Sequence, residues 1–191
     1  MESKKFDPAK LVKLNDPKRF TIMSPDLIWD TLHLSDPQVI VDIGAGTGFF
    51  SVPFSEKMKN GKVYACDISD VMLDWMKENL PADVKESVVP LKMEETKVPL
   101  PDDIADLVYM INLHHELDSA KDIIAECQRL LKKGDTLMII DWKKEEMEDG
   151  PPLSIRVTEE DIRSDMHAGG FTKIIAHPVL PYHHFVVGEK S

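Results

Sequence analysis

One short stretch constrains the fold most strongly: an apolar run at residues 39–43 ends directly in three glycines within five positions, in VDIGAGTGFF at residues 41–50. Nearly continuous β-branched residues are typical of a strand that is buried on both faces. Glycine costs backbone entropy in any ordered element, so this density predicts a turn where backbone comes close to a ligand. A helix is expected to follow at about residues 47–59, with Pro53 as a kink.

The same alternation continues to the end of the chain. We expect further strands at residues 62–66, 88–91, 105–111 and 136–141, with helices at about 69–80, 119–132 and 158–168. Gly134 is expected to cap the 119–132 helix. The segments FTKIIAH and YHHFVVG predict a final antiparallel pair. This order predicts an α/β fold: a Rossmann-like, doubly wound, mostly parallel sheet with helices on both faces.

Length and charge limit the classes of protein that remain. The 191 residues fit one domain, 1–191, with a helical prelude at 1–37 that Ser24 helps to cap and a core at 38–191. A net charge of −11 opposes binding to phosphate backbones, and the lysines among the first eighteen residues are interpreted as a solvated edge. No apolar run is long enough to span a membrane, and no secretory signal is present. Two cysteines give neither a disulfide framework nor a zinc spacing, which favours a cytoplasmic location.

The glycine spacing bears on which nucleotide could bind. It is Gly-x-Gly-x-Gly, and Phe49 stands where a pyrophosphate-binding turn would place its last glycine, which argues against a nicotinamide dinucleotide. Asp67 ends the second predicted strand, where a carboxylate can accept hydrogen bonds from both ribose hydroxyls of an adenosine. The alternative is that Asp67 caps the helix that begins near Ser69.

With these motifs the chain resembles the class I S-adenosylmethionine-dependent methyltransferases, in the branch similar to ubiquinone/menaquinone-biosynthesis methyltransferases. The resemblance covers about residues 37–188 and is carried by VDIGAGTGFF, VYACDIS, MEETKVPLPDD, DLVYMINLHHELD and RLLKKGDTLMIIDW. The segments DWKKE and GPP, followed by Arg156, also resemble small stand-alone members. The family implies seven strands with the last antiparallel, and S-adenosylmethionine as cofactor with S-adenosylhomocysteine as product.

The resemblance also implies roles for individual residues. The glycine stretch and Asp42 would line the methionine and ribose part, Asp67 would hold the ribose, and Glu94 falls where the family usually has an aspartate near adenine. The full set of implied cofactor-binding residues is Asp42, Gly44, Ala45, Gly46, Gly48, Asp67, Ile68, Met72, Met93, Glu94 and Asn112.

The acceptor side is less constrained, because methyl transfer from a sulfonium is an in-line displacement that requires alignment but no obligatory acid or base. His115 is a candidate catalytic residue that orients or deprotonates an acceptor, and Arg156 is a candidate clamp for an anionic one. The alternative is that the histidine pair caps its loop and contacts the next helix. A metal site formed by His114, His115, His183 and His184 is a minor alternative, and no metal is predicted.

The sequence therefore predicts a methyltransferase that acts on a small-molecule acceptor, with a homodimer left open. Two other classes compete with it: a cofactor-binding protein without catalysis and a nicotinamide-dependent oxidoreductase. Arsenite methylation is disfavoured because it depends on several cysteine thiolates, whereas Cys127 belongs to an apolar helix stripe and Cys66 ends a buried strand.

Overall fold

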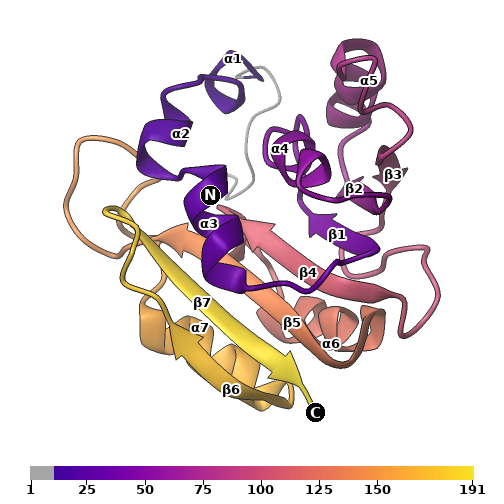
Figure 1. Cartoon of the computed structure of the whole chain (residues 1–191). Coiled ribbons are helices and arrows are strands. Elements are labelled where there is room, and N and C mark those ends of the chain that lie inside the picture. The colour runs from indigo at the N-terminus through magenta and orange to yellow at the C-terminus, as the bar shows by residue number, and fades with distance from the viewer. Residues whose placement is uncertain (1–10) are drawn as a thin grey trace.

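The computed structural model describes residues 11–191, and it contains a single seven-stranded sheet in the order β3-β2-β1-β4-β5-β7-β6 (Figure 1). The parallel strands are β1 (Val39–Ile43), β2 (Lys62–Asp67), β3 (Val88–Lys92), β4 (Ala105–Ile111) and β5 (Leu131–Trp142). The last strand, β7 (His183–Lys190), runs antiparallel between β5 and β6 (Phe171–Ala176). The predicted sheet is confirmed, including its antiparallel last strand.

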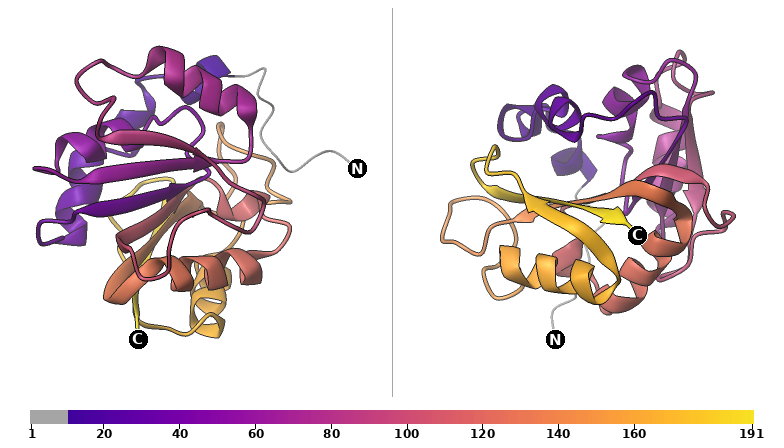
Figure 2. Two further views of the ribbon diagram at one scale, coloured as in Figure 1. Left: turned by 90° about the vertical axis from the view of Figure 1, so that its right-hand side faces the viewer. Right: turned by 60° about the horizontal axis from the view of Figure 1, so that its bottom comes forward.

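Helices cover both faces of the sheet (Figure 2). One face packs against α3 (Pro25–Leu32), α4 (Ser51–Glu56) and α5 (Asp70–Asn79), and the opposite face packs against α6 (Ala120–Leu130) and α7 (Glu159–Ala168). Two short helices, α1 (Leu11–Leu14) and α2 (Arg19–Ile22), precede α3. The predicted caps are confirmed: the hydroxyls of Ser24, Ser69 and Thr158 accept hydrogen bonds at the starts of α3, α5 and α7.

Two predicted helices have different bounds. The helix expected at residues 47–59 is only α4, because residues 44–48 form a turn and the helix begins at Ser51. Pro53 is the third residue of α4, where its missing N–H has no intrahelical partner to lose, so it does not kink the helix. The expected cap at Gly134 was also wrong. Helix α6 ends at Leu130, β5 starts at the next residue, and Gly134 lies inside β5 with φ of 85°.

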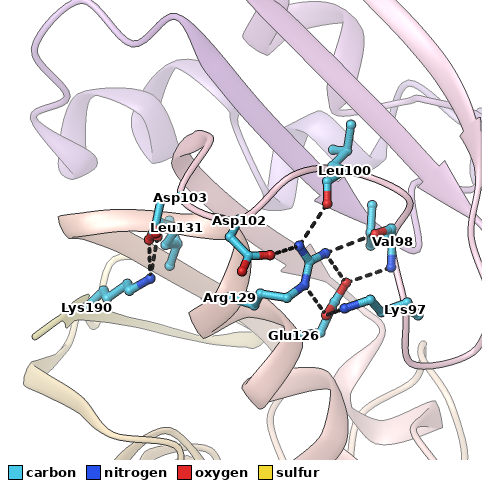
Figure 3. A network of polar contacts seen from close by, with 9 residues as sticks. All are labelled: Lys97, Val98, Leu100, Asp102, Asp103, Glu126, Arg129, Leu131 and Lys190. Carbon is cyan, nitrogen blue, oxygen red and sulfur yellow. Dashed lines mark hydrogen bonds and ion pairs between the residues drawn. The ribbon is translucent and has the colours of Figure 1, made fainter.

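The amino-terminal ends of the parallel strands are fixed by charged groups that have partners (Figure 3). The Arg129 guanidinium binds both carboxylate oxygens of Glu126, at 2.9 and 2.6 Å, and it also donates to the carbonyl oxygens of Val98 and Leu100. Lys190 in β7 donates to Asp103 and to the carbonyl oxygen of Leu131. These contacts tie α6, the β3–β4 loop and the sheet together.

Of the five lysines noted near the start of the sequence, Lys4, Lys5 and Lys10 lie outside the described residues. Within residues 11–191, no helix is both long and apolar enough to cross a membrane.

Candidate active site

The glycine turn lies at the carboxyl end of β1, between β2 and the prelude. Gly44, Gly46 and Gly48 have φ of 73°, 57° and 74°, a left-handed region that other residues rarely adopt. The Gly46 N–H donates to the Asp67 carboxylate at 2.8 Å, and a Cβ on Gly46 would lie 3.4 Å from a methyl carbon of Leu14. The turn therefore keeps bare backbone at the strand end, beneath α1.

Asp67 connects this turn to helix α5. One carboxylate oxygen accepts from Gly46 N–H, and the other accepts from Ser69 N–H, also at 2.8 Å. Burial of the side chain raises the pKa of Asp67 above its usual value, while these hydrogen bonds act in the opposite direction. Ser69, not Asp67, provides the side-chain cap of α5. Asp67 therefore braces the turn, and its contact with a ribose stays a prediction.

Asp42 is buried near the end of β1 and is held by two hydroxyl groups. Its Oδ2 accepts from Ser51 at 2.5 Å and from Tyr109 at 2.7 Å. Burial raises the pKa of Asp42 to about 7, even though both hydrogen bonds lower it. Tyr109 faces Asp42 because the two residues pair across β1 and β4. Ser51 and Tyr109 were missed by sequence analysis, and only this strand register could have pointed to the tyrosine.

The residues expected around adenine differ in their exposure. Ile68 is 41% exposed, which leaves apolar surface beside Asp67 for a planar ring. Met72 and Met93 are buried, and Met93 belongs to the core cluster that α6 and α7 cover. Glu94 is exposed and forms an isolated bridge with Lys97. Ile68 and Glu94 can therefore contact a ligand directly, whereas the methionines support the surface from below.

Two polar side chains near the ends of β1 and β4 have buried atoms without hydrogen-bond partners: Oγ1 of Thr47 and Oδ1 of Asn112. The Asn112 backbone has φ of 58°, and its N–H donates to the Ile140 carbonyl oxygen at 2.8 Å. Buried polar groups are nearly always hydrogen-bonded, so an unpartnered atom indicates a group that a ligand can satisfy. Thr47 was not among the predicted residues, although it lies inside the glycine stretch.

His115 pairs with a buried carboxylate. Its Nδ1 lies 2.7 Å from Asp141 Oδ1, and its backbone N–H donates to Asp141 Oδ2 at 3.0 Å. The Trp142 N–H donates to the same carboxylate at 2.7 Å. In the tautomer in which Nδ1–H donates to Asp141, the lone pair lies on Nε2, which is 3.7 Å from Glu116 Oε1. Sequence analysis singled out His115 but missed Asp141, which follows an apolar strand in the way Asp67 does.

The neighbouring His114 has a different environment. Its Nε2 lies 3.0 Å from an Asp165 oxygen in α7, while its buried Nδ1 has no partner. This contact is made with α7, whereas the alternative interpretation expected a contact with the next helix along the chain, which is α6. His183 lies in β7 on the other face of the sheet. In residues 11–191 no group of three or more His, Cys, Asp or Glu side chains could hold a metal ion.

Arg156 is buried within the loop that follows β5. Its guanidinium donates to the carbonyl oxygens of Pro151, Glu145 and Asp149, at 2.7, 2.8 and 3.0 Å, and to that of Lys143 at 3.4 Å. Its donors are thus directed at the loop backbone. This position favours a role in shaping the loop over the predicted clamp on an acceptor.

Both cysteines are buried, and burial raises the pKa of each thiol well above its usual value. Neither side chain is therefore a thiolate at neutral pH, which agrees with the low expectation for arsenite chemistry.

The unpartnered groups cluster at one edge of the sheet. Among the described residues, every buried side-chain nitrogen or oxygen without a partner belongs to Thr47, Asn112, His114 or His183. Thr47 follows β1, Asn112 and His114 follow β4, and His183 pairs with Trp142 at the end of β5. Ligands of doubly wound sheets bind outside the carboxyl ends of the strands, next to the point where strand order reverses, here between β1 and β4.

Comparison with known proteins identifies the family of this chain. A family model described as a methyltransferase domain matches residues 41–139, which is more than half of the chain. The chain belongs to the methyltransferase domain family. A crystal structure of an S-adenosylmethionine-dependent methyltransferase from Aquifex aeolicus is 32% identical with a TM-score of 0.92, and the match covers 98% of this chain and 100% of that one.

Curated relatives of this methyltransferase match over shorter segments. The ubiquinone/menaquinone biosynthesis C-methyltransferase UbiE of Marinomonas sp. is 30% identical over 57% of this chain and 44% of its own length. A tRNA(Phe) aminocarboxypropyltransferase of Methanocaldococcus jannaschii is 27% identical over 58% of this chain and 41% of its own. The match thus spans less than half of either relative.

These findings confirm the predicted family, and the protein is an S-adenosylmethionine-dependent methyltransferase. The residues at the carboxyl edge fit that cofactor. The glycine turn offers bare backbone, Asp67 offers a carboxylate, Ile68 offers apolar surface, and two unpartnered oxygens lie at the strand ends.

Proposed function

We propose that this methyltransferase transfers the methyl group to a small-molecule acceptor by in-line displacement at the carboxyl edge of the sheet. The observation that carries the proposal is the gathering of unpartnered buried polar atoms at this one edge. Buried polar atoms without partners lower the stability of the folded chain. Their concentration at the edge where this fold binds ligands therefore supports a role in binding.

In the proposed site, the turn at residues 44–48, together with Asp42 and Asp67, holds the methionine and ribose parts of the cofactor. Ile68 and Glu94 approach adenine, with Met72 and Met93 packed beneath, and Ala45 and Asn112 complete the set. When bound, S-adenosylmethionine supplies an electrophilic methyl group on a sulfonium. The protein aligns the acceptor with that methyl and excludes water from it.

His115 is the proposed general base for an acceptor that must lose a proton. Asp141 accepts from its Nδ1–H and from two backbone N–H groups, which fixes the ring orientation and leaves Nε2 to take the proton. The contact also stabilises the imidazolium that forms, as a buried carboxylate does in other catalytic pairs. This arrangement supports catalysis over a cofactor-binding protein without catalysis, because it gives one imidazole a fixed orientation at the proposed site.

The prelude supports a small acceptor. Phe20 of α2 stacks on Phe49 at 4.2 Å between ring centroids, and Leu14 lies over Gly46, so α1 and α2 cover the glycine turn. The net charge of −11 also disfavours a nucleic acid. The cytoplasmic location and the homodimer stay predictions.

The test is to incubate the protein with S-adenosylmethionine labelled in its methyl group and a whole-cell extract, followed by separation by size. We expect label in the small-molecule fraction, and a loss of roughly a hundredfold or more in rate for His115→Ala if His115 acts as base. The Asp141→Asn variant should alter the pH profile of turnover. Label found only in RNA or protein would overturn the small-molecule proposal, and full activity of His115→Ala would overturn the base.

A further inference from the structure

His183, the first residue of β7, is a buried side chain that lacks partners. It is 1% exposed, and neither ring nitrogen has a hydrogen-bond partner. Its ring lies 4.2 Å from the Trp142 ring, at the end of the β5–β7 ladder. Burial lowers the pKa of His183 to about 3, so the neutral ring presents one N–H donor and one acceptor. Two unpartnered nitrogens cost stability that a ligand would recover.

Arg19 of α2 is a cation with no carboxylate within ion-pair distance in the described part of the chain. Its guanidinium lies over the rings of Phe49 and Phe50, at 4.7 and 5.4 Å, and it donates to the Leu14 carbonyl oxygen. Burial lowers the pKa of Arg19 to about 10, which still leaves it charged. A partly desolvated guanidinium held against aromatic rings is well suited to bind an anionic oxygen.

Arg19 and His183 approach one another from different parts of the sequence. Helix α2 lies beside the segment that leads into β7 (Figure 1), where Phe20 and Leu180 belong to one apolar cluster, and the Arg19 charge contributes to the depressed pKa of His183.

Trp142 follows Asp141 at the end of β5, and its ring lies on the His183 face of the sheet, opposite to the carboxylate that binds His115. The Arg156 guanidinium lies 5.8 Å from the centroid of the same ring. The prelude, β5 and β7 thus bring together a cation, a neutral imidazole and an indole.

We infer that Arg19, His183 and Trp142 form the acceptor subsite, and that the acceptor carries a planar ring with an anionic oxygen group, a carboxylate or a phenolate. Arg19 and the His183 N–H would bind the anionic oxygen, and Trp142 would pack against the ring. This inference rests on the proposed small-molecule acceptor and adds its chemical class. It also accounts for the unpartnered His183 nitrogens, which have no role in holding the cofactor.

The test uses the full chain saturated with S-adenosylhomocysteine and two matched probes, 4-hydroxybenzoate and the uncharged 4-hydroxybenzyl alcohol. Binding is followed by the nitrogen signals of the histidine rings in NMR. We expect the anion to bind at least about tenfold more tightly and to shift the His183 signals. The Arg19→Gln variant should remove this preference. As a control, Arg163→Gln changes an arginine of α7 that lies 3.8 Å from Glu159, and it should retain the preference.

Three results would overturn the inference: equal affinities for the two probes, an unchanged preference in Arg19→Gln, or no binding of either probe at roughly 10 mM. Affinity for S-adenosylhomocysteine is measured in each variant, so a folding defect would be recognised, and His183→Phe keeps an aromatic ring beside Trp142 as a second variant. If the probe experiment gives one of these results while labelled methyl groups still enter small molecules, the subsite is rejected and the proposed function remains supported.

Discussion

The two ends of the parallel strands differ in how completely their polar groups are paired. At the amino ends, Arg129 and Glu126 bind one another and the β3–β4 loop (Figure 3). In the same region Asp106 accepts from Lys132 and from the N–H groups of Gln38 and Val39. At the carboxyl ends, Thr47, Asn112, His114 and His183 each retain a buried atom without a partner. One edge stabilises the fold, and the other gives up stability where ligands bind.

The comparison predicts its largest effect at the amino edge. Arg129→Ala should lower the free energy of unfolding by about 3 kcal/mol, because Glu126 would become a buried carboxylate without its arginine. Urea unfolding measures this, and S-adenosylhomocysteine affinity should stay within about threefold. Arg163→Ala is the matched control and should cost about 0.3–0.5 kcal/mol, as exposed helix pairs do. A loss of cofactor affinity larger than the loss of stability would break the comparison.

Asp67 sharpens the comparison, since it lies at the carboxyl edge yet has partners. Asp67→Ala should weaken cofactor binding by about 1.5–3 kcal/mol, the range for hydrogen bonds to a charged group. Some stability should also be lost, because the N–H groups of Gly46 and Ser69 lose their acceptor. Calorimetric titration with S-adenosylhomocysteine measures the affinity, with Asp70→Ala, at an exposed carboxylate of α5, as control. An unchanged affinity for S-adenosylhomocysteine would mean that Asp67 only stabilises the glycine turn.

His183 should make the carboxyl edge sensitive to acid. The unfolded chain binds a proton at His183 below a pKa near 6.5, whereas the folded chain does not until about 3, so its contribution to stability falls with falling pH. Asp42, with its pKa raised to about 7, acts in the opposite direction. The difference in unfolding free energy between wild type and His183→Phe isolates the histidine.

That difference should move by about 2 kcal/mol in favour of His183→Phe between pH 7 and pH 5. His167→Gln, at an exposed histidine of α7, is the control and should leave the pH profile as it is in the wild type. A difference that does not change with pH would mean that His183 finds a partner in solution.

The smallest effect is expected at Thr47. Thr47→Val removes a buried hydroxyl without a partner and nearly keeps the shape, so it should stabilise the chain by about 1 kcal/mol. The same change should weaken S-adenosylhomocysteine binding if the hydroxyl serves the cofactor. Unfolding and titration on one preparation measure both. Destabilisation without loss of binding would place Thr47 with the structural residues.

Much of the fold could be predicted because its signals are local. The apolar runs, the glycine turn and the capping residues Ser24, Ser69 and Thr158 identify their elements within a few neighbouring positions. Bounds failed where tertiary contacts overrode local preference: Leu131 pairs with Ala105 in the sheet and ends α6 before Gly134. The three glycines have positive φ and cannot belong to a right-handed helix, so α4 begins only at Ser51.

The sequence by itself determined the family and the order of the strands along the chain, since each depends on residues close together in the chain. It also predicted the edge of the sheet at which the cofactor is expected to bind. Only the tertiary structure paired Asp141 with His115, Tyr109 with Asp42, and Arg19 with the surroundings of His183. These partners lie 26, 67 and more than a hundred positions apart, where no periodicity connects them. Strand register and helix packing determine these contacts, because they fix which distant side chains share one face and one end of the sheet.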